Sequence, residues 1–249
     1  MTTKFAHMMR GFIATTAFAA AATAQAAPVV PDFGSFGPLP TATFGGSGIP
    51  NGAVAITSFT GFRGNTITLG LTAHQRFSNP ALGNDGAGTF YADPGRNGGN
   101  PGNPSNGTQG ALWNFGWYIG GSNLSGYSFR LYYDFDPGAG TDQSELGSFD
   151  PKFLAGIVYG GNNGSQNLDF AMLESWPSDS PDYASFDPYA IGEYSFALVA
   201  LRNGTEVARS AIRVAVGSVN EVPAPASVAL LGMGLLALRL ARRRQPRHR

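Results

Sequence analysis

Apolar and polar residues alternate with a period of two along much of the chain, which is typical of β-strands that bury one face and expose the other. Residues 66–73 and 129–135 each follow this alternation. The clearest case is the stretch 194–216, where two alternating runs flank Asn203 and Gly204. Because Asn and Gly tolerate the positive φ angles of a type I′ turn, this stretch is predicted to be a β-hairpin.

The rest of the body predicts further strands and no capped helix. Weaker strands are expected at residues 53–59, 112–119, 153–159 and 168–173. The segments between them are rich in Gly, Pro, Asn, Asp and Ser, which favour turns. We therefore predict an all-β fold, an antiparallel β-sandwich of the jelly-roll or immunoglobulin-like kind, over residues 51–220. An irregular arm or an edge strand is expected before it, at residues 27–50.

The N-terminal segment has the layout of a secretory signal. Basic residues precede an apolar, alanine-rich stretch at residues 11–24, and the small-x-small triplet Ala-Gln-Ala follows it. This pattern predicts a signal peptide over residues 1–26, recognised by the Sec machinery as a short helix, with Ala27 as the first residue of the exported chain.

Setting the two termini aside changes the charge balance. The whole chain is formally neutral, but residues 27–222 hold eight basic residues against all 16 Asp and Glu, which gives a net charge of −8. Such a surface repels phosphate backbones, so we expect no nucleic-acid partner. Cysteine is absent, so core burial, alone or together with a bound metal, must hold the exported body together without disulfides.

The C-terminal segment combines an apolar run with a basic end. From residue 226 to residue 238 every residue except Ser227 is apolar or Gly, and six arginines follow. Positive charge beyond an apolar run holds the end of a chain on the cytoplasmic side of a membrane, so a single transmembrane helix is predicted here. Its basic anchor consists of Arg239, Arg242, Arg243 and Arg244.

A proline motif, Val222-Pro223-Ala224-Pro225, stands directly before the apolar run. Motif, apolar helix and Arg-rich end, in this order over residues 221–249, resemble the PEP-CTERM sorting signal of Gram-negative bacteria, with Ala224 where that signal usually has glutamate. The resemblance implies that the chain is an exosortase substrate: a precursor anchored in the inner membrane, cut near the proline motif and delivered to the cell surface or the extracellular matrix. It also implies a structural or interaction role linked to exopolysaccharide and biofilm.

The acidic segment 134–145 is a candidate calcium site. Asp134 and Asp136 share a face at the end of a predicted strand, and Asp142 and Glu145 could return from the loop to complete an oxygen cage for Ca²⁺. The segment departs from the EF-hand pattern and has no flanking helix pair, so a solvated acidic turn is the alternative. No other cofactor is predicted.

Two tryptophans are candidates for carbohydrate stacking. Trp113 and Trp117 fall on one side of a predicted strand, where their flat faces could contact sugar rings, as in a carbohydrate-binding module. The alternative is that this face belongs to the core, because large aromatic side chains mostly bury.

Candidates for catalysis are few. His74 is the only histidine of the body, and it lies on the polar face of a threonine-rich strand, where it is expected to face solvent. No pair of carboxylates has an apolar neighbourhood that would mark it as a glycosidase pair. We therefore expect no enzyme, and an extracellular hydrolase is the weaker alternative.

Overall fold

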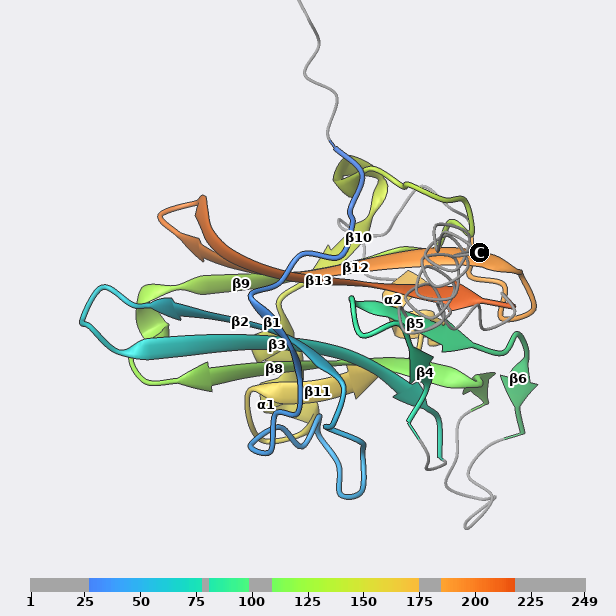
Figure 1. Cartoon of the computed structure of the whole chain (residues 1–249), viewed down its shortest axis with the longest axis horizontal. Coiled ribbons are helices and arrows are strands. Elements are labelled where there is room, and N and C mark those ends of the chain that lie inside the picture. The colour runs from blue at the N-terminus through green and yellow to red at the C-terminus, as the bar shows by residue number, and fades with distance from the viewer. Residues whose placement is uncertain (1–26, 78–80, 99–108, 175–184, 218–249) are drawn as a thin grey trace, which may run out of the picture.

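The computed structural model describes residues 27–77, 81–98, 109–174 and 185–217, which form two β-sheets packed face to face (Figure 1). The first sheet has the order β1 (Ser35–Gly37), β2 (Val54–Thr60), β3 (Thr66–Gln75), β8 (Trp113–Gly121) and β11 (Asn163–Gln166). The second has the order β10 (Gly147–Phe149), β9 (Ser128–Tyr133), β12 (Gly192–Arg202), β13 (Thr205–Val216), β5 (Thr89–Ala92) and β4 (Gly83–Asn84). A separate ladder joins β6 (Arg96–Asn97) to β7 (Gly110–Ala111).

The predicted mostly-β fold is confirmed, and among the described residues the strands pair antiparallel with one exception. β13 and β5 run parallel, which the long stretch of chain between them permits. The assignment to a jelly-roll or an immunoglobulin-like type stays a prediction.

The hairpin predicted around Asn203 and Gly204 is confirmed as β12 and β13. Asn203 has a φ of 52° and Gly204 a φ of 78°, which is the left-handed backbone that a type I′ turn requires. β9 pairs with the other edge of β12, so the hairpin lies in the middle of the second sheet.

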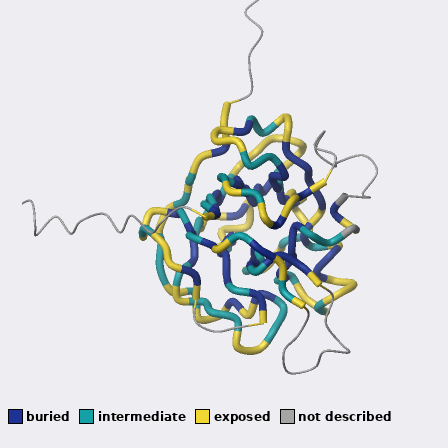
Figure 2. The backbone as a smooth tube through the Cα atoms, turned by 90° about the vertical axis from the view of Figure 1, so that its right-hand side faces the viewer, coloured by how far each residue is buried: buried dark blue, intermediate teal, exposed yellow. Residues whose placement is uncertain are grey.

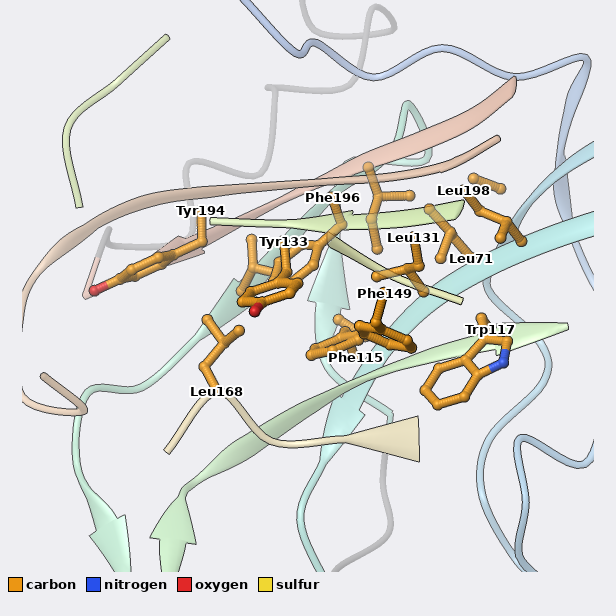
Figure 3. Close-up of a cluster of buried hydrophobic side chains, with 14 of the residues drawn as sticks. Leu71, Phe115, Trp117, Leu131, Tyr133, Phe149, Leu168, Tyr194, Phe196 and Leu198 are labelled. Atoms are coloured by element: carbon orange, nitrogen blue, oxygen red, sulfur yellow. The ribbon is translucent and has the colours of Figure 1, made fainter. Parts of the chain in front are cut away.

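The core lies between the two sheets and is largely aromatic (Figure 3). Alternate residues of β8 point inward, and Phe115 and Trp117 are fully buried. From the opposite sheet, Phe196 of β12 stacks on Phe115 with ring centroids 4.8 Å apart. Burial of one such side chain is worth about 1.5–3 kcal/mol, so this aromatic layer is what holds the sheets together.

Two of the predicted strands are wrong. Residues 151–158 form the helix α1 (Pro151–Val158), because the Asp150 carboxylate accepts hydrogen bonds from the backbone N–H groups of Lys152 and Phe153 at 2.9 and 3.1 Å, and proline is favoured at the next position. Residues 168–173 form a turn and the short helix α2 (Ala171–Glu174). Two 3₁₀ turns, Leu124–Gly126 and Gln143–Glu145, complete the helical elements of the described residues.

The N-terminal arm covers the outer faces of both sheets. Val29 is 4% exposed and packs with the second sheet, in a cluster with Leu146, Ala197, Val199 and Ala211. Further along, β1 is an edge strand paired with β2, and Phe44 is buried against the outer face of the first sheet. The strands under the arm are therefore buried on both faces, whereas the exposed residues gather at turns (Figure 2).

No helix within the described residues is long and apolar enough to cross a membrane. The predicted signal helix, residues 1–26, and the predicted transmembrane helix, within residues 221–249, both lie outside the described residues.

Candidate functional site

The candidate site is a cavity of about 540 Å³ on the outer side of the first sheet. The turn 44–50 of the N-terminal arm forms its roof, and β3, β8 and β11 supply its floor. The lining residues are Phe44, Gly45, Gly46, Ser47, Gly48, Ile49, Pro50, His74, Gln75, Arg76, Phe77, Asn114, Tyr159, Ser165 and Phe170. Small-molecule sites in proteins typically measure roughly 300–1,000 Å³, so the cavity has a suitable size.

Aromatic contacts fix the roof in place. Phe44 is fully buried, with its ring against Gly116 of β8. Gly45 has a φ of 80°, and a Cβ there would lie 2.6 Å from the ring of Tyr159, so glycine allows this ring to pack against the turn. The Tyr159 hydroxyl donates to the backbone carbonyl of Ser165, which ties the roof to β11.

His74 lies in the floor of the cavity, and the expectation that it faces solvent is wrong. It is only 3% exposed, because the roof covers the polar face of β3. Its Nδ1 lies 3.0 Å from the Gln75 carbonyl oxygen, and its Nε2 lies 2.9 Å from the Ser165 hydroxyl. A carbonyl can only accept, so we assign the proton to Nδ1, and the Ser165 hydroxyl then donates to Nε2.

A chain of amides continues this network away from the cavity. Asn114 donates from Nδ2 to the Ser165 hydroxyl oxygen at 3.1 Å, and its Oδ1 accepts from Nδ2 of Asn167 at 2.7 Å. Asn167 is fully buried and also bonds the backbone of Ala111 and Trp113. A satisfied network of this kind holds the floor in one arrangement.

The Ser165 hydroxyl donates to His74 as the nucleophilic serine of a catalytic triad donates to its histidine. The network lacks the carboxylate that completes such a triad. The partner of His74 Nδ1 is a neutral carbonyl, which stabilises an imidazolium far less than an aspartate does. Burial lowers the pKa of His74 to about 4, with Arg76 as a further cause, so His74 is neutral at pH 7. A base of such low pKa gains little as a proton acceptor at neutral pH.

Arg76 supplies the charge of the cavity. Its guanidinium lies 4.3 Å from the ring centroid of Phe77 and 4.7 Å from that of Phe170. Burial lowers the pKa of Arg76, whereas the nearby Asp169 raises it. The Asp169 carboxylate also accepts two hydrogen bonds from Arg96, at 2.5 and 2.6 Å, so it is shared between two guanidinium groups.

The prediction that Trp113 and Trp117 form a sugar-stacking platform is wrong. They are 2% and 0% exposed, because the inner face of β8 faces the second sheet. Trp113 packs edge-on against Phe196 with centroids 6.0 Å apart, and Trp117 lies within the core (Figure 3).

The structure does not bring the four predicted calcium ligands together as a cage. Asp134 is 1% exposed and accepts from the backbone N–H groups of Asp136 and Ser195, at 2.9 and 3.2 Å. Asp142 and Glu145 form the reciprocal capping box of a 3₁₀ turn. Because backbone amides occupy these carboxylates, no group of three or more acidic or His side chains within the described residues is placed to hold a metal ion.

Sequence reasoning missed the pocket because its residues are far apart in the chain. His74, Asn114 and Ser165 come from three strands that meet only in the folded sheet. The only hint in the sequence was the polar stretch that forms β11. It has too few apolar residues to be recognised as a strand.

The remaining predicted residues belong to the tail, outside the described part of the chain. Residues 221–245 match the family model of the PEP-CTERM protein-sorting motif. The chain carries a PEP-CTERM sorting motif. The match includes the proline motif and the four anchor arginines, so the predicted resemblance is confirmed. No curated protein and no solved structure shows significant similarity to the chain.

Proposed function

We propose that the chain is exported as a precursor held in the inner membrane by its tail, cut near the proline motif by an exosortase, and delivered to the cell surface or the extracellular matrix. The observation that carries this proposal is the match of residues 221–245 to the PEP-CTERM motif. A signal-like N-terminus supports it, because an exosortase substrate must first cross the inner membrane.

At the cell surface the β-rich body would act by binding or as a structural component of an exopolysaccharide matrix or biofilm, and not as an enzyme. Two features support a non-catalytic role. The one histidine of the body is held neutral by burial, and its Nδ1 faces a carbonyl instead of a carboxylate. The four carboxylates proposed for calcium serve the local backbone.

The experiment is an intact-mass measurement on the chain recovered separately from the inner membrane and from the culture matrix of the native host. We expect the matrix form to start at Ala27 and to end near Pro225. A full-length C-terminus found only in the inner membrane would contradict exosortase processing and would leave the tail as a permanent anchor.

Variants of the proline motif separate recognition from general effects on export. The double change Pro223→Ala and Pro225→Ala should leave the precursor uncut in the inner membrane. Pro94→Ala, far from the motif in sequence, is the matched control and should be processed normally. Ala224→Glu restores the usual residue of the motif and should process at least as fast as the natural chain.

A further inference from the structure

The chain leaves the β-sandwich at the end of β13, next to two strongly exposed apolar side chains. Gly217 follows β13, and its backbone N–H donates to the Ala92 carbonyl at 2.9 Å, which holds it at the end of β5 (Figure 1). A Cβ on Gly217 would lie 2.8 Å from the Ile191 side chain, so Ile191 lies beside the exit of the chain. Ile191 is 69% exposed and Tyr189 is 65% exposed, and we call this pair the exit patch.

Hydrogen bonds hold the backbone of the exit patch in one arrangement. The Tyr189 N–H donates to the Asp187 carboxylate at 2.9 Å, and the Ala190 N–H donates to the Asp187 carbonyl at 3.1 Å, so the patch lies on an ordered turn. The Pro188 carbonyl accepts from the Gly95 N–H at 2.6 Å, which ties this turn to the segment after β5. Two large apolar side chains that an ordered turn presents to water favour contact with another apolar surface.

The sequence after Gly217 limits how far the exit patch can lie from the membrane. Eight residues, 218–225, separate Gly217 from Ala226, where the apolar run of the predicted transmembrane helix begins. An extended chain advances at most about 3.6 Å per residue, so the nine steps from Gly217 to Ala226 span at most about 32 Å. While the tail is anchored, this end of the sandwich therefore stays close to the lipid surface, where a high effective concentration favours even weak contacts.

The charges at this end favour lipid with neutral headgroups. Arg96 pairs with Asp169 at 2.5 Å and Arg213 pairs with Glu193 at 3.0 Å, while Asp93 is exposed. The body also has a net charge of −8, so it is repelled by anionic headgroups. Apolar insertion into a neutral interface is the contact that remains, and it suits tyrosine, whose ring is apolar while its hydroxyl can stay hydrated.

We propose that the exit patch docks on the lipid surface of the inner membrane while the tail anchors the precursor, with Tyr189 and Ile191 inserted among neutral headgroups. The inference rests on the proposed anchored precursor and adds its orientation: the end of the sandwich with residues 187–192 faces the bilayer. The contact depends on the tether, because two side chains give little affinity to a body that diffuses freely. Cutting near the proline motif therefore also releases the body from the lipid surface.

The test measures the membrane depth of a spin label on the full-length chain, reconstituted in phosphatidylcholine vesicles. The chain has no cysteine, so Ala190→Cys carries a single label between Tyr189 and Ile191 and leaves both in place. A label among lipid collides mainly with oxygen, which concentrates in the bilayer, whereas a label in water collides mainly with a water-soluble nickel complex. We expect oxygen collisions to dominate. Salt at about 1 M should not reverse this result, because apolar insertion is not screened.

Paired variants of the labelled chain locate the docking surface. Tyr189→Ser combined with Ile191→Ser should return the label to water, with loss of the excess of oxygen collisions. Phe153→Ser combined with Ile157→Ser is the matched control and should leave the label among lipid. These two side chains of α1 are 61% and 66% exposed, and α1 packs on β9 and β11 instead of beside the exit of the chain. All four changes are at exposed positions, so the core stays intact.

Flotation of the same vesicles separates a failure of docking from a failure of anchoring. A chain that floats while nickel collisions dominate overturns the docking and leaves the anchored precursor standing. A chain that does not float overturns both. A label shielded from both reagents would mean that protein, either a second copy or residues 218–225, covers the exit patch, and this too overturns docking on lipid. Equal effects of the two double variants would do the same.

Discussion

Two buried titratable side chains, His74 and Asp134, should act on the stability of the fold in opposite directions over one pH range. Burial lowers the pKa of His74 from 6.5 to about 4, and burial raises the pKa of Asp134 from 3.8 to about 6. Between pH 4 and 6, unfolding makes His74 take up a proton and makes Asp134 release one. The free energy of unfolding therefore rises with pH because of His74 and falls with pH because of Asp134.

The two effects should nearly cancel. The stabilisation linked to His74 is fully present above pH 6.5 and is lost as the pH falls towards 4, whereas that linked to Asp134 is fully present below pH 3.8 and is lost as the pH rises through 6. At about 1.4 kcal/mol per pKa unit, each shift corresponds to about 3 kcal/mol. The groups lie on different sheets and have different hydrogen-bond partners, so their contributions should add.

Single variants expose each effect. As the pH increases from 4 to 6.5, the free energy of unfolding of Asp134→Asn should rise by about 3 kcal/mol more than that of the natural sequence does. As the pH increases from 4 to 6, the free energy of unfolding of His74→Gln should fall by about 3 kcal/mol relative to that of the natural sequence. The double variant should return to the natural slope, even if both substitutions lower stability overall, because the slope depends only on the protons exchanged.

The assay is urea unfolding of residues 27–220 at several pH values, followed by the fluorescence of the buried tryptophans. The unfolding free energy is compared between variants at each pH, so carboxylates common to all of them cancel. Slopes in both single variants that equal the natural slope would refute the reasoning, since they would mean that neither group is buried as the structure places it.

Three further predictions concern stability. Asp150→Ala should lower the free energy of unfolding by about 1 kcal/mol, because α1 loses its N-cap. An unchanged midpoint of urea unfolding would contradict the capping role. Val29→Ala should cost about 1–2 kcal/mol, whereas Val30→Ala, at a residue 52% exposed, should cost almost nothing, and equal effects would argue against docking of the arm. Adding Ca²⁺ should leave the melting temperature unchanged; a rise that Asp136→Asn abolishes would mean that the acidic loop can rearrange into a cation site.

The alternation of apolar residues predicts strands well where a turn signal accompanies it. Residues 194–216 show this, because a turn signal and two alternating runs agree. The same reasoning fails at α1, where the apolar run in residues 153–158 fits a strand or a helix. The deciding signal there is Asp150 before a proline, a cap that lies outside the run itself.

The pocket was beyond prediction for a different reason. On β3, Thr72 and His74 lie on the face that carries the polar residues of the alternating pattern. The alternation alone predicts that this face is exposed to solvent. The arm removes it from water, with Phe44 and the turn 44–50 placed above it by contacts far apart in sequence. Burial of a polar face by a distant segment leaves no local pattern, although such a face is where a binding site can form.

The N-terminal arm connects export to the proposed binding activity. It begins at the predicted cleavage point, anchors on the second sheet through Val29, and then supplies the roof of the pocket at residues 44–50. An arm that is not docked would leave His74 and Arg76 open to water, so the pocket exists only while the arm is docked on the sheets. The proline motif, by contrast, lies beyond the last described strand, and cutting there removes none of the residues that line the pocket. The sorting motif and the candidate binding pocket therefore lie on separate segments, which is why each proposal can be tested without the other.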